Sequence, residues 1–193
     1  MGARIRGTSI EGAYGNRIPE SYLRNPSEAN PFDFWVRTLD FRPMRLRDFF
    51  DPDSVALELR GGTKDEVLAE MVGLLRVDER SHQTLLRLVH RREQLGSTGI
   101  GRGVAVPHCR SLAVGRLRVA FGRHRTGIEY EAIDHRPVTS VFLIAAPPME
   151  VANQYLPVLG RIAHLVKEAD TPERLARLET VEEFFALLDQ KAG

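Results

Sequence analysis

The sequence predicts an α/β fold in which a central mixed β-sheet is flanked by helices. Helical patterns occupy both ends of the folded part of the chain, and strand patterns lie between them. Residues 138–146 form the most hydrophobic run and are typical of a central strand that is buried on both faces. With 42% hydrophobic and 27% charged residues in 193, the chain can bury a sizeable core.

The regular pattern begins at Met44, so we expect a single folded domain over residues 44–193. Residues 1–43 carry scattered turn formers and little periodicity, and we expect them to be a poorly ordered extension. Their aromatic residues, among them Trp35, offer surface for docking on the domain or on a partner.

The first half of the domain predicts one strand and two helices. After a turn at residues 51–53, residues 55–59 alternate like a short strand. Thr63 and Glu66 have the spacing of a capping box and predict a helix to about Leu75. A second helix is expected from Ser81 to about Gln94, ended by Gly96.

The second half predicts strands followed by helices. Strands are expected at residues 117–121, 127–130 and 138–146. Residues 151–169 have a helical period, with Pro157 either in the first turn or at a kink. Further helices are predicted from Thr171 and, after a second capping box, from Thr180.

Several classes of protein are disfavoured by composition and spacing. No apolar run is long enough to span a bilayer and no secretory signal opens the chain, so we expect a cytoplasmic protein without membrane insertion. The single Cys109 and the spacing of the histidines give no metal motif, and we expect neither metal nor cofactor. The 27 basic residues are balanced by 26 acidic ones, which argues against nucleic-acid binding.

The stretch 91–110 concentrates the chemistry of the chain. Its glycines predict a loop with N–H groups free to point at an anion, followed by a strand at residues 104–106 that delivers His108 to its end. The loop matches neither the dinucleotide fingerprint nor the P-loop, so nucleotide binding is not expected. Pro107 fixes the backbone before His108, and Arg92 supplies a guanidinium ahead of the loop.

His108 has two interpretations. A histidine after a buried strand is by default a packed core residue. The loop, Pro107 and Arg92 instead favour a neutral imidazole that accepts a phosphoryl group. Cys109 should point to the opposite face of the strand, as a small core residue.

Arginines dominate the charge between Leu95 and Ile128, where no acidic residue occurs. They form either a solvated face of the sheet or a field that favours phosphate near His108. The six are Arg102, Arg110, Arg116, Arg118, Arg123 and Arg125.

Together these motifs resemble the active-site signature of the mannitol/fructose and nitrogen-regulatory type of enzyme IIA of the bacterial phosphoenolpyruvate-dependent phosphotransferase system. The resemblance covers Met44 to the C-terminus. It rests on Arg92-Glu93 and on residues 95–101, 103–108, 127–130, 132–134, 137–138 and 142–147.

The resemblance implies a mixed sheet flanked by helices and a histidine that is phosphorylated by the carrier protein HPr. By matching positions, His108 is the phosphoryl acceptor, Arg92 the cation near the phosphate, and Ser97 and Thr98 polar loop residues beside it. Tyr155 stands where the family usually has a second active-site histidine. Because tyrosine can donate a hydrogen bond but cannot supply an imidazolium, phosphate stabilisation or onward transfer is expected to be impaired.

The resemblance therefore implies a phosphocarrier of the nitrogen-regulatory kind, that is, a phosphotransferase with a phosphohistidine intermediate. Its expected partners are phospho-HPr and regulatory targets such as a kinase, a transporter or a transcription factor. The absence of an attached sugar-binding or membrane domain favours regulation over transport. The alternatives are a binding module of the same fold without phosphotransfer, and the IIA component of a fructose/mannitol-type transporter.

Overall fold

The computed structural model describes residues 45–149 and 154–191. The predicted extension at residues 1–43 lies outside the described residues, as do positions 151–153 of the helix expected from residue 151. Within the described part, a short 3-10 helix η1 (Leu46–Phe49) leads into a mixed α/β unit. The predicted α/β fold with a central mixed sheet is confirmed.

The sheet mixes parallel and antiparallel pairs. In the described ranges it has six strands, and its order is β1-β5-β6-β3-β2, with β4 pairing with β6 as well. The β5–β6 and β2–β3 pairs are antiparallel, whereas β1–β5, β3–β6 and β4–β6 are parallel. The bounds are β1 (Phe50–Ala56), β2 (Gly99–Gly101), β3 (Val104–Ala105), β4 (His108–Arg110), β5 (Arg118–Ile128) and β6 (Val138–Ala146).

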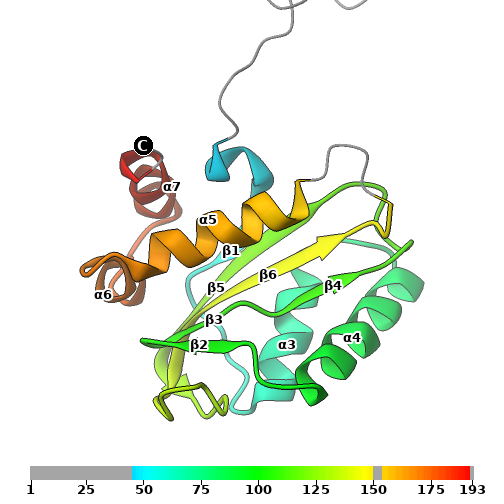
Figure 1. Cartoon of the computed structure of the whole chain (residues 1–193), viewed down its shortest axis with the longest axis horizontal. Helices are drawn as coiled ribbons and strands as arrows, with labels where there is room; N and C mark the ends of the chain where they lie inside the picture. Colours follow the sequence, from blue (N-terminus) through cyan, green and yellow to red (C-terminus); the bar gives the residue numbers. More distant parts are fainter. Residues whose placement is uncertain (1–44, 150–153, 192–193) are drawn as a thin grey trace, which may run out of the picture. The chain divides into compact units, whose positions relative to one another are not determined.

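Helices cover both faces of the sheet (Figure 1). Helices α3 (Lys64–Gly73) and α4 (Glu79–Gln94) lie on one face, and α5 (Tyr155–Lys167), α6 (Thr171–Ala176) and α7 (Val181–Gln190) on the other. Successive residues of a strand point to opposite faces, so Leu143 of β6 packs in the α3–α4 core and Phe142 contacts Phe184 of α7. The hydrophobic run at residues 138–146 is therefore the central strand that its composition predicted.

Aromatic rings fill the core under α7. The rings of Phe121 and Phe184 stack with centroids 4.4 Å apart, and Phe50 meets Phe184 edge-on at 5.1 Å. All three side chains are buried, and such pairs add stabilisation beyond the area they bury. This cluster fixes α7 against β1 and β5.

Local sequence signals set the helix starts. Both predicted capping boxes form, Thr63 with Glu66 and Thr180 with Glu183. The expected start of the second helix at Ser81 is wrong: α4 begins at Glu79, because the carboxylate of Asp78 accepts the N–H of Ser81 and caps the helix. Pro157 lies in the first turn of α5, where its missing N–H costs no helix hydrogen bond.

Two strand predictions need correction. The first strand begins at Phe50 instead of Val55 and includes the residues 51–53 expected to form a turn. Its pairing with β5 shifts register between Phe50 and Val55, and an edge strand tolerates Pro52 at such an irregularity. The two strands expected at 117–121 and 127–130 are one continuous strand, β5, with its own register shift before Ile128.

Candidate active site

His108 begins a strand instead of ending one. Strand β3 lies beside Ser140 and Val141 of β6, and β4 then takes the same side of β6 with His108 opposite Ile144. Between them, the carbonyl of Pro107 accepts the N–H of Ile144 at 3.0 Å. The expectation that residues 104–106 deliver His108 to their end is thus corrected: β3 stops at Ala105 and β4 starts at His108.

Two hydrogen bonds define the tautomer of His108. The Nδ1 atom lies 2.8 Å from the carbonyl oxygen of Val106. Because a carbonyl only accepts, Nδ1 carries the proton and Nε2 carries the lone pair. Arg92 at the end of α4 donates its Nε–H to that Nε2 atom at 3.1 Å. The same guanidinium donates Nη1–H to the carbonyl of Gly96 at 2.9 Å, which holds it at the Nε2 edge of the ring.

The surroundings of His108 favour the neutral imidazole. Partial burial lowers its pKa, the hydrogen bond to the Val106 carbonyl works in the opposite direction, and the charge of Arg92 lowers the pKa further. The net shift is downward from an ordinary value of 6.5. At neutral pH the Nε2 lone pair is therefore available as a nucleophile.

His108 opens into a cleft of about 320 Å³ between the end of α4, strand β4 and the start of α5. Tyr155, the first residue of α5, is buried against it, with ring centroids 6.1 Å apart in an edge-on arrangement. Burial raises the pKa of Tyr155, so its hydroxyl stays protonated at neutral pH. The cleft is lined by Leu88, Arg91, Arg92, Leu95, His108, Cys109, Arg110 and Tyr155.

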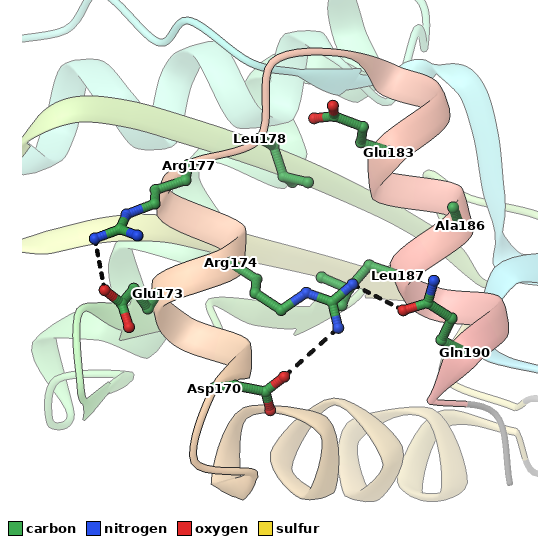
Figure 2. A pocket seen from close by; sticks show the side chains of 9 residues that line it. All are labelled: Asp170, Glu173, Arg174, Arg177, Leu178, Glu183, Ala186, Leu187 and Gln190. Carbon is green, nitrogen blue, oxygen red and sulfur yellow. Dashed lines mark hydrogen bonds and ion pairs between the residues drawn. The ribbon is translucent and has the colours of Figure 1, made fainter.

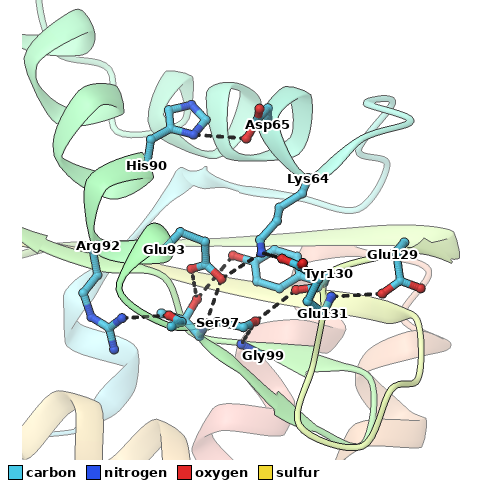
Figure 3. A network of polar contacts seen from close by, with 12 residues as sticks. Lys64, Asp65, His90, Arg92, Glu93, Ser97, Gly99, Glu129, Tyr130 and Glu131 are labelled. Atoms are coloured by element: carbon cyan, nitrogen blue, oxygen red, sulfur yellow. Dashed lines mark hydrogen bonds and ion pairs between the residues drawn. The ribbon is translucent and has the colours of Figure 1, made fainter.

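Ser97, which is exposed, and Thr98, which is buried, support the loop through hydrogen bonds to the protein. The hydroxyl of Ser97 donates to the Tyr130 carbonyl at 2.9 Å and accepts the N–H of Gly99 at 3.1 Å. Both the N–H and the hydroxyl of Thr98 donate to the carboxylate of Glu93, at 2.8 and 2.6 Å. Figure 3 shows the Glu93 side chain between Lys64 and Ser97. The predicted role of both residues beside a phosphate stays a prediction.

Glu93 is the residue that sequence reasoning passed over. It follows Arg92, is 7% exposed, and places its Oε1 atom 3.2 Å from Nζ of Lys64. Lys64 also pairs with Glu131 at 2.9 Å and lies over the ring of Tyr130 at 4.8 Å. Burial works against the Lys64 ammonium, but the hydrogen bonds that it donates to Glu131 and Glu93 and the charges of these carboxylates outweigh burial and raise its pKa. The adjacent pair Arg92-Glu93 was the sequence signal that could have indicated this role. Arg92 lines the cleft, and Glu93 binds Thr98 of the loop.

The glycine loop differs from the expected anion cradle. Gly96, Gly101 and Gly103 do adopt positive φ angles, as a glycine-specific turn requires. However, the N–H of Gly96 binds the carbonyl of Glu93, and that of Gly99 binds the hydroxyl of Ser97. The expectation that these N–H groups are free for an anion is therefore wrong, and residues 99–101 form strand β2 instead. Positive charge at the cleft comes from arginine side chains.

Other predicted and observed features contribute no chemistry here. Cys109 is buried on the opposite face from His108, as expected, and burial raises the pKa of its thiol to about 12. A second groove of about 430 Å³ lies between α6 and α7 (Figure 2). Its arginines are already neutralised: Arg177 pairs with Glu173 at 2.7 Å and Arg174 with Asp170 at 3.5 Å. In residues 45–149 and 154–191, no helix is long and apolar enough to cross a membrane.

Comparison with known proteins assigns the family. Residues 48–191 match the family described as "Phosphoenolpyruvate-dependent sugar phosphotransferase system, EIIA 2", and the chain belongs to it. Among solved structures, the nitrogen regulatory protein IIA-Ntr of Neisseria meningitidis superposes with a TM-score of 0.68 at 29% identity, over 74% of this chain and 98% of that one. The family resemblance and its fold are thus confirmed.

Characterised relatives fall into two groups. A nitrogen regulatory protein of Pseudomonas aeruginosa is 29% identical over 147 residues, which cover 75% of this chain and 95% of the relative. The fructose-specific EIIABC component of Bacillus subtilis is also 29% identical, over 151 residues and 76% of this chain, but the chain spans only 23% of that protein. The chain is thus similar to both nitrogen regulatory and sugar-transport EIIA proteins.

Proposed function

We propose that this protein is a phosphocarrier of the nitrogen-regulatory kind that accepts a phosphoryl group from phospho-HPr on Nε2 of His108. The observation that carries the proposal is the paired hydrogen bonding of His108. The Val106 carbonyl holds the Nδ1 proton, and this directs the lone pair of Nε2 toward Arg92 and the cleft. A nucleophile and a cation for the transferred oxygens therefore meet at one point.

In the transfer, the Nε2 lone pair forms a bond to phosphorus while the P–N bond of the donor breaks and returns its electron pair to the donor nitrogen. The proton on Nδ1 stays between His108 and the Val106 carbonyl. Arg92 exchanges its hydrogen bond to Nε2 for bonds to the phosphoryl oxygens, to which its planar guanidinium is suited. Its other bond, to the Gly96 carbonyl, keeps it at the mouth of the cleft.

The regulatory role is supported by the comparison with nitrogen regulatory proteins, which the chain matches over nearly their whole length. In this role, phosphorylation of His108 changes the affinity for regulatory partners in the cytoplasm. The likeness to a fructose-specific EIIABC component supports a second role, donation of the phosphoryl group to a sugar-specific IIB component. Transfer from the phosphorylated protein to purified IIB domains distinguishes the two.

A different function, binding without phosphotransfer, is favoured by one observation. Tyr155 packs edge-on against His108 where a second histidine is expected, and it cannot supply an imidazolium. Under this alternative, His108 is never phosphorylated and partners recognise the surface around the cleft.

One labelling experiment separates these functions. The protein is incubated with phosphoenolpyruvate, enzyme I and HPr, and acid-labile phosphate is measured. We expect about one phosphoryl group on the wild type, none on His108→Ala, and wild-type labelling on His164→Ala, which removes an exposed histidine of α5. A wild-type protein that takes up no phosphate would refute phosphotransfer and leave the binding module.

A further inference from the structure

A second arginine faces the cleft from the strand that carries His108. Arg110 lies two residues after His108 in β4, so both side chains leave the same face of the strand. Arg110 is exposed, and it lines the same cleft as His108 and Arg92. Its guanidinium therefore has access to any group that reaches Nε2 of His108.

The position of Arg110 is fixed by an aromatic ring. Its Cζ atom lies 4.5 Å from the centroid of the Tyr155 ring, within the range of a cation–π contact. The ring itself is 8% exposed and is packed edge-on against His108. A hydrogen bond from Nη1 to the Pro148 carbonyl, at 3.5 Å, is at the upper limit for such a bond and adds little to the restraint from the ring. Tyr155 thus connects the two functional side chains of β4.

Arg110 also keeps its charge available. Some exposed arginines of the unit pair with carboxylates, for example Arg116 with Asp51 and Arg177 with Glu173. Among the described residues, Arg110 forms no ion pair with a carboxylate; its contacts include the side chain of Tyr155 and a backbone carbonyl. A guanidinium placed on a ring without an acidic partner is ready to bind an incoming anion.

We propose that Arg110 is a second catalytic residue that binds the transferring phosphoryl group, and that Tyr155 is the residue that positions it. This inference rests on the proposed function. The transferring phosphoryl group spreads its negative charge over three oxygens, and the bidentate guanidinium of Arg92 binds two of them at most. Tyr155 cannot supply a second cation, but its ring holds the guanidinium of Arg110, which can. The site therefore operates with two arginines, one from α4 and one from β4.

The test measures the rate of His108 phosphorylation with two donors. Phospho-HPr requires protein docking, whereas phosphoramidate is a small chemical donor that does not. We expect Arg110→Gln to slow phosphorylation by at least about tenfold with both donors, because a preorganised charge at the transferring group is lost. Arg110→Lys keeps the charge but not the planar contact with the ring, and should give an intermediate rate. The matched control is Arg125→Gln, an exposed arginine near the opposite end of β5.

The positioning role of Tyr155 is tested by a double-mutant cycle. Tyr155→Phe keeps the ring and removes only the hydrogen bond of the hydroxyl to Arg110, so it should slow the reaction less than Tyr155→Leu does. Tyr155→Leu should slow the reaction by about two- to fivefold. In the Arg110→Gln background the same change should have no further effect, because the guanidinium it positions is gone. A merely structural role would slow both backgrounds equally and would refute the positioning role.

The possible failures are distinguishable. Absence of phosphohistidine in the wild type with both donors would overturn the proposed function itself. A phosphorylated wild type, with Arg110→Gln as fast as Arg125→Gln, would overturn only the role of Arg110. Loss of rate with phospho-HPr alone would also contradict the inference, since it would assign Arg110 to docking.

Discussion

The buried carboxylate of Glu93 should be a principal support of the loop before His108. The change Glu93→Gln keeps the shape of the side chain but removes its charge. The amide oxygen can still accept the N–H of Thr98, whereas the amide nitrogen meets the Thr98 hydroxyl or the ammonium of Lys64. Hydrogen bonds to a charged group contribute about 1.5–3 kcal/mol each, and breaking a buried pair costs about 3–5 kcal/mol.

Two features of the structure reduce this cost. The Lys64 side chain is 18% exposed and keeps Glu131 as a partner, and the Thr98 hydroxyl can rotate to accept from the new amide. We therefore expect a loss of about 2–3 kcal/mol in the free energy of unfolding. In a domain of this size, that lowers the melting temperature by about 4–12 °C.

The assay is urea unfolding followed by circular dichroism, with the midpoint falling and the slope unchanged. The matched control is Glu131→Gln, which removes a carboxylate from the same lysine. Because the Glu131 side chain is 79% exposed, this change should leave the midpoint within error. Equal midpoints for the two variants would refute the idea that the buried network, rather than the lysine, stabilises the loop.

Further predictions concern pH and glycine. Burial and the Arg92 charge both oppose protonation of His108, so its pKa, measured by nuclear magnetic resonance, should lie below the ordinary value of 6.5. Arg92→Gln should raise this pKa. A wild-type pKa above 6.5 would contradict the argument. Because the pKa of His108 is lower in the folded state, the unfolded chain binds more protons at this residue. His108 should therefore lower the free energy of unfolding as the pH falls below about 6.5, and His108→Gln should weaken this acid sensitivity. Gly99→Ala should destabilise by about 1–3 kcal/mol, because a Cβ would lie 2.7 Å from Cα of Ala132. Gly160→Ala, at an open helical position, should instead stabilise by about 0.5–1 kcal/mol, and calorimetry that gave both changes the same sign would contradict the packing argument.

What the sequence determined by itself is local or contained in continuous motifs. Capping boxes such as Thr63 with Glu66 set helix starts because both partners lie within one turn. The apolar run at residues 138–146 identified the central strand because a strand covered on both faces has no polar side. The Pro107-His108 motif singled out the histidine that we propose as the acceptor, and the resemblance indicated the family. Boundaries failed at β1 and β5, where pairing with a neighbour decides how far a strand extends.

What only the tertiary structure decided is which side chains meet. Arg92 and His108 come from different elements, and it is the packing of α4 against β4 that joins the guanidinium to Nε2. The N–H groups of Gly96 and Gly99 were expected to be free. They are hydrogen-bonded to the Glu93 carbonyl and the Ser97 hydroxyl, respectively. From the sequence, Tyr155 is only a replacement of the expected second histidine. The structure shows that its ring contacts the guanidinium of Arg110. Contacts between residues distant in the chain depend on the packing of whole elements, which local patterns do not encode.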